Sequence, residues 1–70
     1  MKNLNTFYVV WVVDGPVMMT VLQYTNEEMA AVKNWTTNHF VEQAKDVEEI
    51  EQDATYELVA IFSGNIEFVY

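Results

Sequence analysis

Apolar residues follow two different periods along this chain, and the change of period separates strands from helix. Residues 6–13 and 17–24 are rich in β-branched and aromatic side chains and flank Asp14-Gly15-Pro16, a pattern typical of two strands joined by a turn. Asp-Gly favours a tight hairpin turn, but Pro16 has no backbone donor. The pattern therefore predicts a first hairpin without fixing its register.

The residues after this hairpin have the spacing of a helix. Thr25 and Glu28 match a capping box, in which each side chain accepts from the other residue's backbone. Mostly apolar residues then recur at intervals of three and four, which predicts one face lying on the sheet: Met29, Val32, Thr36, Phe40, Ala44, Val47, Ile50 and Ala54. Asp46 begins a second capping-like stretch, so either one long bent helix or two helices would satisfy the pattern.

From residue 56 onwards the strand-like character returns. Residues 56–63 and 66–70 flank Gly64-Asn65, which favours a two-residue hairpin turn and would place Ile61 opposite Phe68. The order ββα(α)ββ predicts an α+β fold in a single domain, residues 1–70. We expect a four-stranded antiparallel sheet made of two hairpins, with one long or broken helix packed on one face.

The predicted strands are apolar on both faces, although one helix layer covers only one of them. In the first strand Phe7, Val9, Trp11 and Val13 alternate with Tyr8, Val10 and Val12, and later Leu58, Ala60 and Phe62 oppose Val59 and Ile61. Large exposed apolar patches usually mark interfaces. We therefore expect a homodimer or an obligate complex across the open sheet face or edge, with candidate contacts at Tyr8, Val10, Trp11 and Val12. Alternatively, strand twist and the acidic segment cover this face within the monomer.

Negative charge dominates the chain and is concentrated in one segment. The net charge is −8, from eleven acidic residues and three lysines without arginine, which argues against direct nucleic-acid binding. Residues 42–57 hold seven carboxylates and one lysine, hence −6. If residues 42–53 are helical, four of these acids form a stripe spaced by about 5 to 6 Å. The candidate partner-binding residues are Glu42, Asp46, Glu48, Glu49, Glu51 and Asp53.

Two interpretations of this acidic segment stand side by side. Charge runs on helices usually serve solubility, so the segment fits a solvated face. Acid near a helix C-terminus opposes the helix dipole, which fits a segment selected to bind the basic surface of a protein, such as a nucleic-acid-handling enzyme. Binding of this kind should be fast and sensitive to salt.

The chain contains few of the residues that usually form catalytic sites. His39 is the only histidine, Ser63 the only serine, and cysteine is absent, so neither a nucleophilic triad nor a transition-metal shell is predicted. Residues 46–51 do not fit a calcium loop, because Ile50 stands at a ligand position and the turn glycine is missing; weak divalent-cation binding by the acids stays open. We expect no enzymatic activity and no cofactor.

The sequence also indicates the cellular compartment. A small domain without cysteine fits a reducing cytoplasm, and the apolar run of residues 7–13 is too short to span a bilayer. We therefore expect a cytoplasmic protein with neither a signal peptide nor contact with a membrane.

In length, acidity, lack of cysteine and lack of catalytic equipment, the chain resembles small phage-encoded proteins that inhibit host defence or nucleic-acid enzymes, some of them as DNA mimics. The resemblance rests on these general properties rather than on a motif. It implies an inhibitor that acts in the host cytoplasm by presenting the acidic segment to a basic surface. The alternative is a structural or antitoxin-like module that acts through its apolar sheet face.

Overall fold

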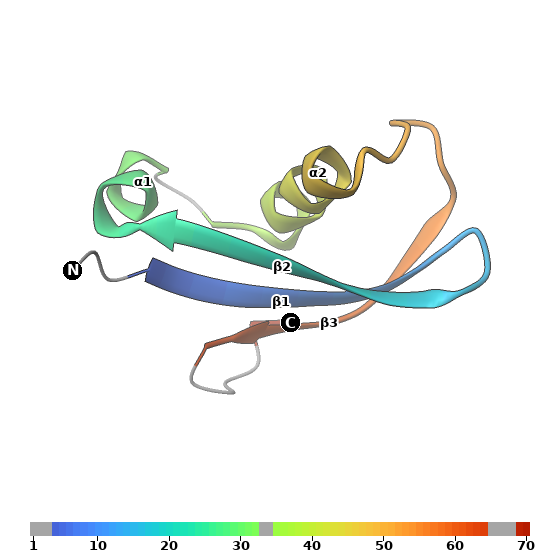
Figure 1. Cartoon of the computed structure of the whole chain (residues 1–70), viewed down its shortest axis with the longest axis horizontal. Coiled ribbons are helices and arrows are strands. Elements are labelled where there is room, and N and C mark those ends of the chain that lie inside the picture. Colours follow the sequence, from blue (N-terminus) through green and yellow to red (C-terminus); the bar gives the residue numbers. More distant parts are fainter. Residues whose placement is uncertain (1–3, 33–34, 65–68) are drawn as a thin grey trace.

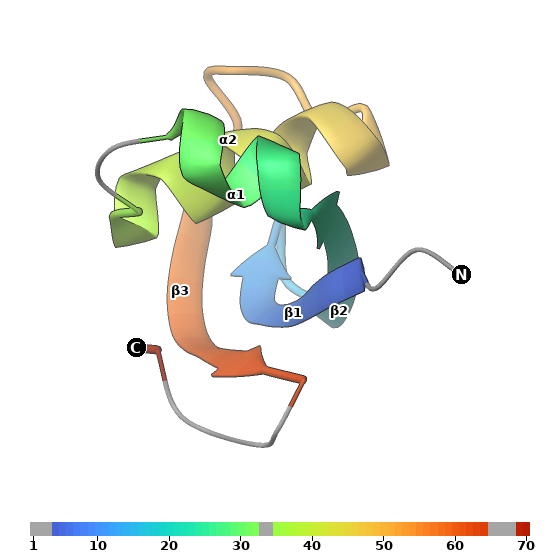
Figure 2. The same ribbon diagram turned by 90° about the vertical axis from the view of Figure 1, so that its left-hand side faces the viewer.

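Three strands and two helices form two layers in the computed structural model, which describes residues 4–32, 35–64 and 69–70 (Figure 1). Both helices lie on the same side of the sheet, and no described helix covers the other side (Figure 2). This confirms the α+β class. The elements are β1 Leu4–Val13, β2 Val17–Thr25, α1 Asn26–Ala31, α2 Thr37–Glu48 and β3 Tyr56–Ser63.

The predicted first hairpin is confirmed, and the structure fixes its register. β1 and β2 pair antiparallel without irregularity from Leu4 opposite Thr25 to Val12 opposite Val17. Asp14 and Gly15 have φ angles of 52° and 113°, and two positive φ angles are what a type I′ turn requires. Pro16 follows the turn, and its carbonyl accepts from the Val13 amide at 3.2 Å. The missing proline donor therefore costs the turn only one of its two closing bonds.

The prediction of a four-stranded sheet is wrong, because the described residues form three strands in the order β2-β1-β3. Residues 66–68 of the expected fourth strand, which was predicted over residues 66–70, lie outside the described part of the chain. The amides of Val69 and Tyr70 both donate to the Ile61 carbonyl, at 2.7 and 3.2 Å. Among the described residues, the end of the chain bonds to β3 only at Ile61, which is too short a contact for a ladder. The partner expected for Ile61, Phe68, lies outside the described residues.

A β-bulge corrects the predicted facing of β3. Ala60 pairs with Val10 and Leu58 pairs with Trp11, so Val59 is an extra residue between two ladder positions. An extra residue reverses the alternation on one side of it. As a result, Leu58 and Ile61 both pack into the core on the helix side, although strict alternation places them on opposite faces.

The helical region is two helices rather than one. Both N-termini are capped by threonine: Thr25 and Glu28 form the predicted capping box, and Thr36 accepts from the backbone of α2. Val32 is extended, so the predicted stripe is interrupted there, while Phe40 and Ala44 are buried in the core. Neither helix of the described ranges combines the length and the apolar character needed to cross a bilayer.

The core fills the space between the sheet and α2. Its centre is Trp11 of β1, fully buried beside residues from every other strand and from α2. The buried apolar set is Val9, Trp11, Val13, Leu22, Tyr24, Phe40, Val41, Ala44 and Ile61. No helix in the described part of the chain covers the other face of the sheet.

Candidate interaction surfaces

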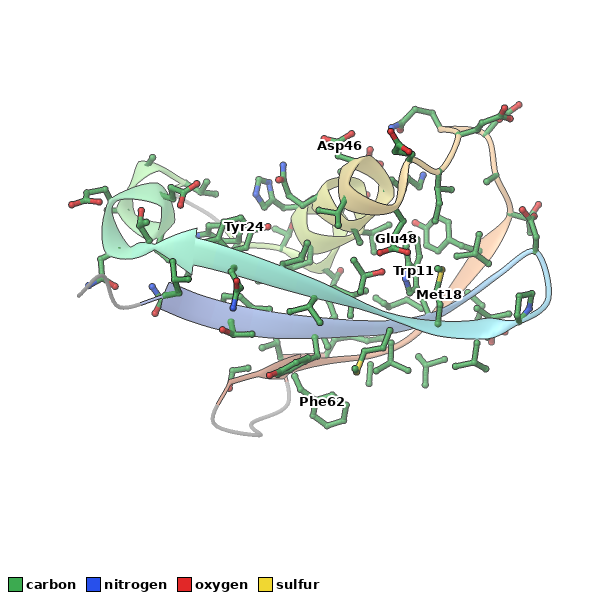
Figure 3. The ribbon with its side chains drawn as sticks, viewed as in Figure 1. Trp11, Met18, Tyr24, Asp46, Glu48 and Phe62 are labelled. Carbon is green, nitrogen blue, oxygen red and sulfur yellow. The ribbon has the colours of Figure 1, made fainter. Side chains whose placement is uncertain are left out.

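The acidic segment lies at the C-terminal end of α2 and in the loop that leads to β3. Glu42 is partly exposed, and the other five candidates are exposed: Asp46, Glu48, Glu49, Glu51 and Asp53. Asp46 lies on the side of α2 that faces away from the sheet (Figure 3). We call these five exposed residues the acidic surface.

The expected helical stripe does not extend through this surface, because α2 ends at Glu48. Glu49 adopts the left-handed conformation with φ 56°, and the Ile50 amide closes the helix end on the Lys45 carbonyl at 2.9 Å. The chain then turns away, so Glu49 and Asp53 do not continue the row begun by Glu42 and Asp46. Val47, expected on the buried stripe, is 56% exposed. Left-handed helix ends usually carry glycine, and its absence here gave the sequence no stop signal.

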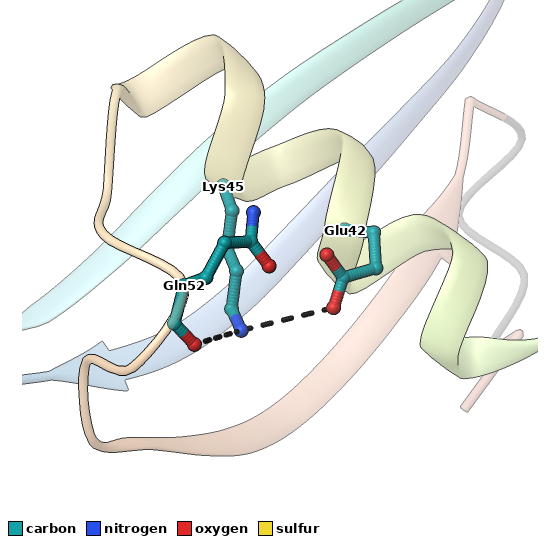
Figure 4. A network of polar contacts seen from close by, with 3 residues as sticks. All are labelled: Glu42, Lys45 and Gln52. Atoms are coloured by element: carbon teal, nitrogen blue, oxygen red, sulfur yellow. Dashed lines mark hydrogen bonds and ion pairs between the residues drawn. The ribbon is translucent and has the colours of Figure 1, made fainter.

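Lys45 is the only lysine or arginine in the described ranges, and its one ion pair is with Glu42 rather than with the acidic surface. Its side chain is buried at 5% exposure. The ammonium donates to the Gln52 carbonyl at 3.3 Å and lies 3.7 Å from the Glu42 carboxylate (Figure 4). It also lies 4.9 Å from the centre of the Tyr56 ring, a cation–π distance. Lys45 therefore fastens the loop to α2, and the five exposed carboxylates have no neighbouring cation within the described residues.

The open sheet face is the second surface, and it is apolar as predicted. Val17, Met19 and Val21 of β2 are 69%, 58% and 44% exposed, and Phe62 projects on the side of the sheet opposite α2 (Figure 3). A shallow hollow of about 460 Å³ lies on this face. Its lining is Tyr8, Val10, Met19, Phe62, Ser63 and Gly64.

Only three of the four expected interface residues lie on the open face of the sheet. Tyr8, Val10 and Val12 lie in register with residues of the open face and are partly exposed. Trp11 does not belong there: it is completely buried on the helix side, and its indole N–H donates to the Thr20 hydroxyl at 2.9 Å. Alternation along β1 explains the difference, because Trp11 is the one odd-numbered residue of the set.

The described residues bring no catalytic or metal-binding group together. His39 packs edge-on against Trp35 at 4.6 Å on the helix side, whereas Ser63 borders the hollow on the open face. No group of three or more His, Asp or Glu side chains among the described residues is close enough to hold a metal ion. The acidic surface is therefore a dispersed set of charges.

Tyr24 is a polar feature that sequence reasoning missed. Its side chain belongs to the core and contacts Trp35 at 4.9 Å between ring centres, and its buried hydroxyl has no hydrogen-bond partner in the described part of the structure. Burial, and secondarily the nearby Glu28 carboxylate, raise the pKa of this phenol above its ordinary value. An alternating strand pattern marks Tyr24 as inward-facing but gives no signal that its hydroxyl lacks a partner.

Comparison with protein-family models, with curated proteins and with solved structures finds no match to this chain. The two surfaces are therefore interpreted from their own chemistry.

Proposed function

We propose that this chain is a small non-enzymatic binding protein that inhibits or regulates a partner with a basic surface, such as a nucleic-acid-handling enzyme. The observation that carries the proposal is that the acidic surface has no neighbouring cation among the residues that the structure describes. Asp46, Glu48, Glu49, Glu51 and Asp53 are exposed within eight positions of one another, while Lys45 is buried. Such a surface attracts a basic partner over a distance of about one Debye length.

The proposal does not include a regular imitation of the phosphate spacing of DNA. A regular row of charges would require the predicted helical stripe over residues 42–53, and α2 ends at Glu48. Competition with nucleic acid would rest on charge and on the shape of the loop. A cytoplasmic setting, in the host if the chain is phage-encoded, is part of the same proposal and follows from the sequence alone.

The test is capture of partners from a nuclease-treated lysate by three tagged forms of the chain. The first is the wild type. The second is the triple variant Asp46→Asn, Glu48→Gln and Glu51→Gln, which removes three of the five charges of the acidic surface. The third is the matched control Asp14→Asn, Glu27→Gln and Glu57→Gln, which changes the same residue types and the same net charge at exposed positions elsewhere.

We expect the wild type and the control to retain a specific nucleic-acid-handling protein at low salt and to release it at high salt, while the acidic-surface variant fails to retain it. The captured protein, once purified, should bind nucleic acid less tightly when the wild type is added. Equal loss in both variants would show that net charge alone attracts proteins to this chain, and the proposal would then be abandoned.

A second candidate function rests on the open sheet face. The exposed Val17, Met19 and Val21 and the hollow beside Tyr8 and Phe62 favour an interaction module of the structural or antitoxin type. Its complex would survive high salt, because apolar burial is not screened. Tyr8→Lys should then release the partner, whereas the acidic-surface triple variant should not.

A further inference from the structure

The outer edge of β2 carries backbone hydrogen-bonding groups to which no described residue bonds. The bond from Val13 to Pro16 marks a bonded pair, and bonded pairs recur at every second residue of an antiparallel ladder. The register then directs the backbone groups of Val17, Met19, Val21 and Gln23 away from β1. The next amide in this series, that of Thr25, bonds to the Glu28 carboxylate at 2.8 Å, in agreement with this assignment. No described residue bonds to the backbone of the four.

This edge lacks the features that usually block strand pairing. Edge strands of natural proteins are kept apart by charge, proline, bulges or short length. β2 has nine residues, VMMTVLQYT, with neither charge nor proline, and its pairing with β1 has no bulge. Three of its four outward-directed residues, Val17, Met19 and Val21, are also exposed apolar residues of the open face. We therefore expect this edge to pair with another strand rather than to stay exposed to solvent.

The distribution of charge, and the fact that pairing of β2 with β2 forms a closed dimer, favour a second copy of the chain as the partner. Two copies with net charge −8 repel each other where their acidic surfaces meet, but β2 itself has no carboxylate. The nearest carboxylates, those of Asp14, Glu27 and Glu28, lie at the two ends of the contact. The opposite sheet edge is occupied at Ile61 by the backbone of Val69 and Tyr70. Pairing of β2 with β2 therefore uses the open edge of each copy and closes on itself, as a two-fold dimer does, instead of growing into a filament.

We propose that two copies of the chain pair antiparallel along β2, with Met19 of each copy opposite Val21 of the other and Val17 opposite Gln23. This register is the one in which all four outward-directed residues of each copy find partners and the capped amide of Thr25 is left out. It joins the two sheets into one and makes the two apolar open faces continuous. The pairing needs no other protein and is independent of the proposed acidic function.

The first test is the molecular mass of the purified chain over a concentration series by sedimentation equilibrium, with two variants. Val21→Pro removes an outward-directed donor and leaves the bonds to β1 in place, which edge strands tolerate. Phe62→Lys adds a charge to the open face on β3, the strand on the far side of β1 from β2. We expect a wild-type dimer, a dimer Kd raised by at least about tenfold in Val21→Pro, and little change in Phe62→Lys.

The second test is amide hydrogen exchange of the wild type, which does not depend on a variant folding. The amides of Met19 and Val21 should become protected as the concentration rises through the dimer Kd. A chain that stays monomeric throughout the series would overturn the proposal. A dimer that Phe62→Lys disrupts and Val21→Pro leaves intact, with unprotected amides at 19 and 21, would overturn it in favour of face-to-face packing.

Discussion

The indole N–H of Trp11 donates to the hydroxyl of Thr20 across the first hairpin, at 2.9 Å and with both residues completely buried. Thr20→Val leaves the indole N–H in the core without an acceptor, and we expect a loss of about 1 to 3 kcal/mol in the free energy of unfolding. Thr20→Ser keeps the hydroxyl and should cost less. Urea denaturation of both variants compares them, and equal losses would show that the methyl group matters more than the bond.

Lys45 should contribute more to stability than its ion pair with Glu42 suggests. The buried ammonium donates to the Gln52 carbonyl, and Lys45→Ala removes this bond together with the packed stem, so we expect a loss of about 1.5 to 3 kcal/mol. Glu42→Gln breaks only a partly exposed pair and should cost about 0 to 1 kcal/mol. If thermal unfolding gives the two variants similar losses, the bond to the loop is not the main contribution.

Tyr24 should make the folded state sensitive to alkaline pH. Its pKa is raised in the folded state, so above about pH 10 the unfolded chain loses this proton first. The unfolded state then binds fewer protons than the folded state, and stability falls as the pH rises. Tyr24→Phe removes the unpartnered hydroxyl and should gain about 1 kcal/mol at neutral pH, with a shallower alkaline decline in urea titrations. If the loss of stability at alkaline pH is the same in Tyr24→Phe as in the wild type, other titrating groups cause it.

Glu49 occupies a left-handed position that costs a side chain with a Cβ about 1 kcal/mol. Glu49→Gly should relieve this strain and stabilise the chain by up to about that amount. Glu49→Gln is the matched control: it removes the carboxylate from the helix C-terminus but keeps the Cβ, so it reports only the smaller dipole effect. A gain of the same size in both variants, measured by thermal unfolding, would assign the cost to charge.

Local signals in the sequence predicted the parts of the fold that local interactions determine. Thr25 and Glu28 are three residues apart and cap α1 with no help from the rest of the molecule. Asp14-Gly15 tolerates two positive φ angles, so the turn of the first hairpin follows from the residue types themselves. Alternation along β1 likewise placed Val9, Trp11 and Val13 on one face, and the structure shows that this is the buried face. The pattern did not say which face the helices cover, so Trp11 was wrongly expected at the interface.

The features that the sequence did not predict depend on contacts between distant segments. The extra residue at Val59 appears only when β3 is aligned with β1. The end of α2 requires Glu49 in an unfavourable conformation, which the Lys45 bond to Gln52 helps to hold. Of the two candidate surfaces, the open face followed from alternation, while the shape of the acidic surface required the position of the loop.

The bulge in β3 gives this strand one residue that the ladder does not use. Eight residues, Tyr56–Ser63, run beside the seven of β1 from Phe7 to Val13. Losing Val59 would restore simple alternation, with Leu58 inward, Ala60 outward and Ile61 inward as before. Losing a residue farther along the strand, with the bulge still in place, would instead reverse the facing of the residues beyond the loss. A gene for this protein can therefore lose the codon for residue 59 and still encode the same buried side chains.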